Sequence, residues 1–286
     1  MSSNSLILNR LFTHSVFQDL IKYEKSDVYS AVVAKYIENH YQKKHIDIFE
    51  EIYLLLSKQY RNEYFYKNTL LTKLLLHRHS INTTVALTQI PIGKSKADFV
   101  LINGKAVVYE IKSELDNYNR LESQLADYFK AFEHVCVVGP ESEFDSLVHM
   151  LNSTPVGIYC LTKRNTFSKT KIKEPRIHHS ELEHKSIFRV LYKHEYECII
   201  EEYFGDIPRT TQVQHYNACL EMFSSIPILE AYRLSVVVMK KRNKRIASQV
   251  KRIPYFLNSV LYFLNPSIRE FEALYSFLNK QFEGDD

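Results

Sequence analysis

The sequence predicts an α/β fold in which helices at both ends of the chain flank a mixed β-sheet. Three observations support this prediction. Over the first 80 residues, apolar side chains recur at spacings of three and four, as they do in amphipathic helices. From residue 83 to residue 161, runs of β-branched residues alternate with turn signals and with helical spacing. From residue 180 onward the pattern is again mostly helical, with breaks at prolines.

Composition limits the kind of protein this can be. The chain has 286 residues, of which 45% are hydrophobic and 24% charged, enough for one large domain or two small ones. A net charge of +4 does not by itself indicate a nucleic-acid partner. No run approaches the ~18 apolar residues of a membrane span, and no secretory leader is evident. We therefore expect a cytoplasmic protein without membrane contact.

Changes in pattern divide the chain into three expected segments. Residues 1–82 should form helices that pack on the core, residues 83–162 the α/β core itself, and residues 163–286 a mostly helical C-terminal region. The polar, basic stretch 163–176 is expected to be an extended connection. The four cysteines have no C-x-x-C spacing, which favours buried free thiols over a zinc site.

Within the core segment the predicted order is β-β-β-α-β-α-β. The predicted elements are, in order, 83–92, 97–102, 105–113, 115–132, 134–139, 141–151 and 156–161. Asn103-Gly104 between two apolar runs is a strong hairpin signal. The closing α-β-α-β alternation implies right-handed crossovers and a sheet covered by helices.

The chemistry-bearing residues lie on this hairpin. Asp98 is in one predicted strand, and Glu110 and Lys112 form an E-x-K sequence in the next. Alternate residues of a strand share a face, so Glu110 and Lys112 should project together. Carboxylate oxygens bind hard cations, and a nearby ammonium can offset charge on a reacting phosphate. These residue types suit metal-dependent hydrolysis of phosphodiesters.

The hairpin register decides whether Asp98 joins Glu110. A two-residue Asn-Gly loop would place Asp98 opposite Tyr109, on the wrong face of the sheet. A three-residue loop, 103–105, pairs Ile102 with Ala106 and places Asp98 opposite Glu110. The sequence favours the longer loop because Gly104 suits the left-handed position that such loops contain.

This segment resembles the PD-(D/E)XK nuclease superfamily. The resemblance rests on Asp98, on Glu110-Ile111-Lys112, and on a Q-x-x-x-Y sequence from Gln124 to Tyr128 that is similar to the RecB-like branch. It covers roughly residues 60–161. More closely, an uncharacterised bacterial family within the superfamily is similar in the stretches RNEYFYKN, KADFVLI and YEIKSELDNYNRL. Ala97 stands where the superfamily's name has proline. The resemblance implies a restriction-endonuclease-like core.

The resemblance also implies residue roles. Asp98 and Glu110 would bind Mg²⁺ or Mn²⁺, with the Ile111 carbonyl as a further ligand. Lys112 would position or activate water, Gln124 would support the site, and Tyr128 would lie beside it. Many members add an acid from a preceding helix, for which Glu63 is the candidate. The alternative for Glu63 is a surface residue paired with Lys67 one helical turn away.

The expected function is therefore metal-dependent hydrolysis of phosphodiester bonds, with DNA as the expected substrate. Two alternatives remain: a catalytically inactive nucleic-acid-binding module on the same fold, and a partner-dependent component of a phage-defence or mobile-element system. Under any of these functions, the protein could act as a homodimer or with a partner protein. The basic run 240–245, with Lys251 and Arg252 beyond it, is either a phosphate-binding patch or a solvated helix face. Arg120 is either ion-paired with Asp116 or available to phosphate.

Overall fold

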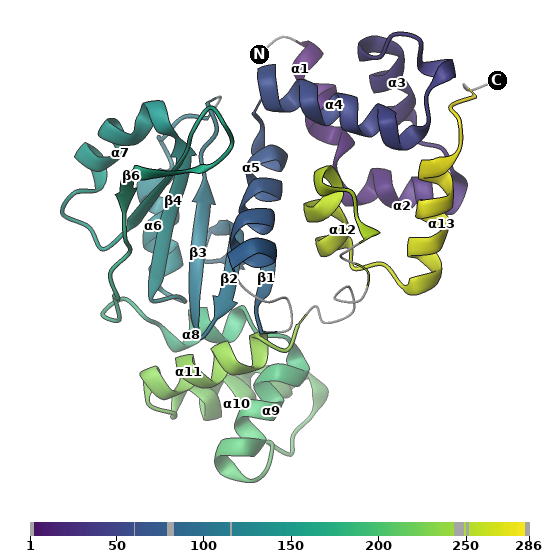
Figure 1. Ribbon diagram of the computed structural model, residues 1–286. Coiled ribbons are helices and arrows are strands. Elements are labelled where there is room, and N and C mark those ends of the chain that lie inside the picture. Colours follow the sequence, from purple (N-terminus) through teal and green to yellow (C-terminus); the bar gives the residue numbers. More distant parts are fainter. Residues whose placement is uncertain are drawn as a thin grey trace. The chain divides into compact units, whose positions relative to one another are not determined.

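The computed structural model describes residues 3–59, 61–78, 83–114, 116–242, 249 and 252–283. The chain divides into two compact units, one of residues 1–78 with 245–286 and the other of residues 79–244. These units differ from the three consecutive segments expected from the sequence. The last helices of the chain belong with the first ones, whereas the helices between residues 184 and 239 belong with the sheet (Figure 1).

A six-stranded mixed sheet forms the centre of the second unit, in the order β1-β2-β3-β4-β5-β6. The strands are β1 (Val85–Ile92), β2 (Ser95–Asn103), β3 (Lys105–Ile111), β4 (His134–Pro140), β5 (Gly157–Leu161) and β6 (Phe167–Lys173). The first three strands form an antiparallel meander, β3, β4 and β5 are parallel, and β6 is antiparallel to β5. The predicted α/β class with a mixed sheet is confirmed.

The predicted β2–β3 register is also confirmed. Ile102 pairs with Ala106 and Asn103 with Lys105, leaving Gly104 at the tip of the hairpin. Gly104 has φ of +75°, a conformation in which a side chain is strained. The loop therefore sets the face on which every β3 side chain lies.

Strand β6 was not predicted. Its sequence FSKTKIK lies within residues 163–176, for which we expected an extended connection. The strand pairs with β5 at one edge of the sheet and carries three lysines. Charged residues, lysine above all, are common on edge strands because they discourage pairing with other chains. This polarity masked the strand signal.

Helices cover the sheet and complete one hydrophobic core. They are α6 (Leu121–Phe129), α7 (Phe144–Leu151), α8 (His184–Arg189), α9 (Lys193–Phe204), α10 (Gln212–Ser224) and α11 (Ile228–Met239), with a 3₁₀ turn, η3 (Glu141–Glu143). The core joins alternate strand residues such as Val100, Val108 and Val137 to Tyr128 of α6 and Phe188 of α8. Helix α6 starts later than the predicted residue 115.

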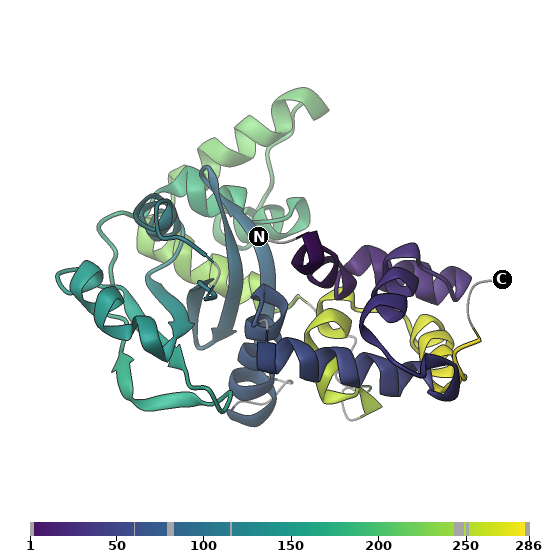
Figure 2. The same cartoon turned by 90° about the horizontal axis from the view of Figure 1, so that it is seen from above.

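The first unit is helical (Figure 2). Its elements are α1 (Ser3–Leu11), α2 (His14–Tyr23), α3 (Asp27–Tyr36), η1 (His40–Gln42), α4 (His45–Gln59), α5 (Glu63–Leu70), the π-helical η2 (Leu71–Arg78), η6 (Tyr255–Leu257), α12 (Asn258–Leu264) and α13 (Ile268–Asn279). Stacked rings such as His45 on Phe277 join the two ends of the chain, with centroids 4.0 Å apart. None of the described helices has the length and apolar character needed to cross a membrane.

The predicted basic run 240–245 is only partly described, since residues 243–248 and Lys251 lie outside the described residues. Arg242 is buried against Glu195 of α9, donating from Nε to Oε1 at 2.6 Å and from Nη2 to Oε2. Its guanidinium also stacks 4.0 Å from the Tyr192 ring centroid. Arg242 therefore ties the end of α11 to α9, and its guanidinium is already occupied.

We expect Arg242→Gln to lower the free energy of unfolding by about 3–5 kcal/mol, because it leaves the Glu195 carboxylate buried without its partner. The neighbouring Lys241 is exposed, so Lys241→Gln should change stability by no more than about 0.5 kcal/mol. Urea unfolding followed by circular dichroism measures both. Equal, small effects would show that the ion pair does not hold α9 and α11 together.

Candidate active site

The predicted E-x-K and Q-x-x-x-Y residues meet at one carboxylate. Glu110, on β3, is 2% exposed. Its Oε1 accepts hydrogen bonds from Lys112 Nζ at 2.9 Å and from Gln124 Nε2 at 2.6 Å. Its Oε2 accepts one from the Tyr128 hydroxyl at 2.6 Å. Gln124 and Tyr128 reach it together because residues four apart lie on one face of α6.

Lys112 lies inside this cluster. The residue is buried, and Nζ also donates to Gln124 Oε1 at 2.9 Å. Its main-chain N–H donates to the Val138 carbonyl at 2.8 Å, which carries the β3–β4 pairing one residue past the end of the strand. The Gln124 amide therefore accepts from the lysine and donates to the glutamate, which fixes both side chains.

Tyr128 is held in its protonated form. Burial raises the pKa of its phenol first, and the negative charges of Glu110 and Asp98 raise it further. The hydroxyl therefore keeps its proton at any ordinary pH. It lies 2.6 Å from Glu110 Oε2 and 3.0 Å from the Lys96 carbonyl oxygen. The Asp98 carboxylate lies near this cluster, because it accepts a hydrogen bond from the N–H of Ile111, the residue after Glu110.

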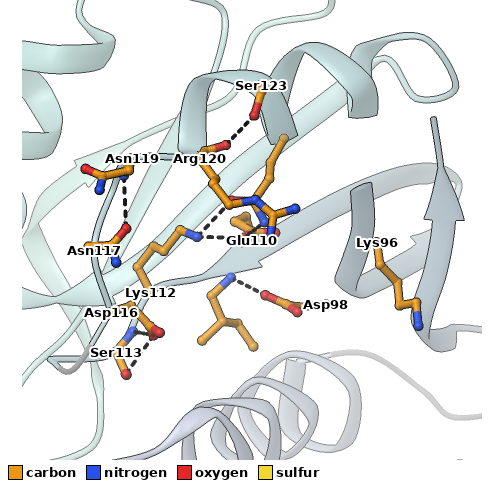
Figure 3. Close-up of polar contacts among 12 residues, drawn as sticks. Lys96, Asp98, Glu110, Lys112, Ser113, Asp116, Asn117, Asn119, Arg120 and Ser123 are labelled. Atoms are coloured by element: carbon orange, nitrogen blue, oxygen red, sulfur yellow. Dashed lines mark hydrogen bonds and ion pairs between the residues drawn. The ribbon is translucent and has the colours of Figure 1, made fainter. Parts of the chain in front are cut away.

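Asp98 lies where strand pairing is interrupted on both sides. The β2–β3 pairing ends at Phe99 and Tyr109, and the Asp98 carboxylate then accepts the Ile111 N–H at 3.0 Å (Figure 3). On the other side, Thr88 Oγ1 donates to the Asp98 carbonyl at 2.7 Å. Gln89 has φ of +55° between the paired positions of β1. The predicted register therefore holds as far as Phe99 and Tyr109. At the next position a side chain of β2 replaces a main-chain partner of β3.

A third group of contacts, which the sequence did not reveal, ties the β1–β2 turn to α6. The Asp127 carboxylate accepts from the Lys94 N–H at 3.0 Å and from Ser95 Oγ at 2.8 Å. A Cβ on Gly93 would lie 2.5 Å from the same carboxylate. We call this set, Gly93–Ser95 with Asp127, the latch. It fixes the start of β2, three residues before Asp98.

The loop between β3 and α6 shows which partners Asp116 has. Asp116 Oδ2 accepts from the Ser113 N–H at 2.8 Å and from Ser113 Oγ at 2.7 Å. It therefore caps the end of β3 and forms no ion pair with Arg120. Arg120 is exposed and has no acidic partner among the described residues.

Glu63 lies on α5 in the other compact unit. Its carboxylate is 2.5 Å from Lys67 Nζ, and the Glu63 side chain is 53% exposed. This is the surface ion pair that the sequence offered as the alternative role. In the ranges that the structure describes, no group of three or more His, Cys, Asp or Glu side chains could hold a metal ion. The predicted carboxylate ligands in the sheet are the two residues Asp98 and Glu110.

Comparison with known proteins gives the family. The model of the family described as bacteriophage P4 protein cII matches residues 56–253, well over half of the chain, so the chain belongs to this family. Protein cII of Enterobacteria phage P4 is 28% identical over 153 residues, which are 54% of this chain and 56% of that protein. The chain thus spans a little over half the length of this relative. No solved structure gives a significant match.

The latch should make stability sensitive to acid. Burial opposes ionisation of Asp127, but its donors Lys130, Ser95 and the Lys94 N–H outweigh burial and hold the pKa below its ordinary value. A lowered folded-state pKa stabilises the fold above the unfolded-state pKa near 4, and this stabilisation is lost as pH falls through the folded-state value. Asp127→Asn should cost about 1–3 kcal/mol at neutral pH and flatten the stability curve below about pH 4. Thermal unfolding across pH, with Asp145→Asn as an α7 control, measures this. An unchanged acid limb would contradict the latch.

Proposed function

We propose that this member of the bacteriophage P4 protein cII family is a metal-dependent nuclease that hydrolyses phosphodiester bonds in DNA. One observation carries the proposal. The buried Glu110 carboxylate is held by Lys112, Gln124 and Tyr128. On the adjoining strand, the Asp98 carboxylate accepts the N–H of Ile111, the residue after Glu110. These five side chains are among those that the resemblance to PD-(D/E)XK nucleases singles out.

The donor set suits a hard divalent cation. Asp98 and Glu110 supply carboxylate oxygens, and the main chain between Glu110 and Lys112 supplies the Ile111 carbonyl. Mg²⁺ is commonly held by one or two carboxylates together with substrate phosphate, and Mn²⁺ accepts the same ligands. Such an ion, when bound, polarises the phosphate and lowers the pKa of the attacking water.

The other side chains act on charge and geometry. The Lys112 ammonium is the cation closest to Glu110, and it can offset negative charge that develops on the reacting phosphate. Gln124 and Tyr128 hold the Glu110 carboxylate in one orientation from a single helix face. A group positioned in this way needs no reorganisation during the reaction, which is a main source of electrostatic catalysis.

The alternative is a nucleic-acid-binding module without cleavage. A buried ion pair is often no more stabilising than apolar residues of the same volume. The fold alone therefore gives little reason to bury Glu110 and Lys112, while a nuclease needs both. The cost of burying this ion pair therefore favours the enzyme. An activity that depends on a partner protein would need the same residues.

The roles of Asp98 and Lys112 separate in a paired experiment. Asp98→Ala should lose Mn²⁺ affinity and DNA cleavage together, because a ligand is removed. Lys112→Ala should keep its Mn²⁺ affinity or gain slightly, because a competing positive charge is removed. Its cleavage rate should still fall by at least ~10²-fold, the scale for loss of one positioned transition-state group. Calorimetry with Mn²⁺ and a cleavage assay on the same preparations measure both quantities.

Lys105→Gln is the matched control, since Lys105 lies on the same strand at the opposite end of the hairpin. It should behave as the wild type in both assays. Cleavage at the wild-type rate by Lys112→Ala would refute the proposed mechanism. Mn²⁺ binding by the wild type without any cleavage would favour the binding module.

Glu63 gives a second test of the ligand set. Its contact with Lys67 leads us to expect that Glu63→Gln leaves Mn²⁺ affinity within about twofold of the wild type, since an exposed ion pair contributes little. Asp98→Asn, measured alongside, should bind Mn²⁺ much more weakly. A comparable loss in Glu63→Gln would instead make Glu63 a third carboxylate ligand.

A further inference from the structure

Three exposed cations near the candidate site have no acidic partner among the described residues. Lys94 and Lys96 lie at the β1–β2 turn and the start of β2, and Arg120 lies just before α6. Most other basic side chains near the site are engaged. Lys112 binds Glu110 and Gln124, and Lys130 binds Asp127.

The strand register brings these cations to the end of the sheet that carries the site. Because β2 and β3 are antiparallel, the start of β2 lies beside the end of β3, where Lys112 is located. Lys96 precedes Asp98 by two residues on the same strand. In the view of Figure 3, Lys96 lies to the right of Asp98 and Arg120 lies above it.

The backbone that carries the two lysines is fixed. The latch holds the Lys94 N–H and the Ser95 hydroxyl on Asp127, and the Tyr128 hydroxyl lies 3.0 Å from the Lys96 carbonyl. The same helix that orients Glu110 therefore also sets the position of the turn. A fixed backbone reduces the ordering cost when the lysines bind a ligand.

We propose that Lys94, Lys96 and Arg120 bind backbone phosphates of a DNA strand on either side of the phosphodiester that reaches Asp98 and Glu110. This assignment rests on the proposed nuclease function and names the residues that hold its substrate. Three cations around two carboxylates also offset the repulsion that the acidic site exerts on a polyanion. These side chains contact phosphates and not base edges, so their contribution to binding does not depend on the DNA sequence.

Salt dependence of DNA binding tests the proposal without cleavage. Fluorescein-labelled duplex DNA and the matching single strand are titrated with protein in EDTA over a range of KCl concentrations. Each phosphate contact contributes a little under one to the slope of log K against log salt. Lys94→Gln/Lys96→Gln should therefore weaken binding and reduce the slope by about 2, and Arg120→Gln should reduce it by about 1. Lys105→Gln, which removes a lysine at the other end of the same hairpin, should leave the slope unchanged.

The latch gives a second arm. Asp127→Ala should weaken DNA binding although Asp127 is itself negative, because the turn is no longer held. Lys130→Gln removes the other partner of Asp127 without touching the turn, and should bind DNA as the wild type does. A latch with only a structural role would lower thermal stability in both variants without this difference in binding.

Three outcomes overturn the assignment: an unchanged slope in the double variant, an equal loss in Lys105→Gln, or no binding of either DNA by the wild type. Calorimetry with Mn²⁺ distinguishes failure of the phosphate assignment from failure of the nuclease proposal. If the double variant keeps wild-type DNA binding while the wild type binds Mn²⁺ and cleaves DNA, only the phosphate assignment fails. If DNA binding depends on Lys94, Lys96 and Arg120 but the wild type binds no Mn²⁺, the phosphate assignment is supported and the nuclease proposal is refuted.

Discussion

The buried charge of Glu110 is the constraint on which the arrangement of the site depends. A carboxylate that is 2% exposed is costly unless hydrogen bonds and an opposite charge compensate it. Lys112 supplies the charge from the same strand, and Gln124 and Tyr128 supply donors from α6. The hydrogen bonds that the Glu110 carboxylate requires therefore fix the rotation of α6 against the sheet. Since Asp127 lies on the same helix, the β1–β2 turn is placed by the same packing.

Much of this was predictable because the rules that govern it are local. The alternation of strand residues gave the shared face of Glu110 and Lys112, and the left-handed preference of Gly104 selected the three-residue loop. Together they gave the register of Asp98 with Glu110. The four-residue spacing of Gln124 and Tyr128 placed both on one helix face. Each inference needed only residues near one another in the sequence.

What could not be predicted depends on contacts between distant segments. Asp127 looked like an ordinary helix residue, because its partners lie some thirty positions earlier in the β1–β2 turn. Arg242 belonged to a basic run, and only the position of Glu195 shows that its charge is already paired. The pairing of the first and last helices in one unit involves residues more than two hundred positions apart. Local sequence patterns do not show which distant residues come into contact. Strand β6 was missed for a different reason, because its polar composition is unlike that of a buried strand.

The site also breaks the rules that made the rest predictable. An ideal antiparallel ladder would continue past Phe99 and Tyr109, but there the Asp98 side chain takes over a main-chain hydrogen bond of Ile111. Gln89 adopts a left-handed conformation beside it, at a cost of about 1–2 kcal/mol for a residue with a Cβ. Such departures persist only where the surroundings over-determine them, and they concentrate at functional sites. Here the surroundings are the latch and the Glu110 cluster, which hold β2 and β3 from one helix. The interruption therefore falls on the residue that the proposed chemistry requires.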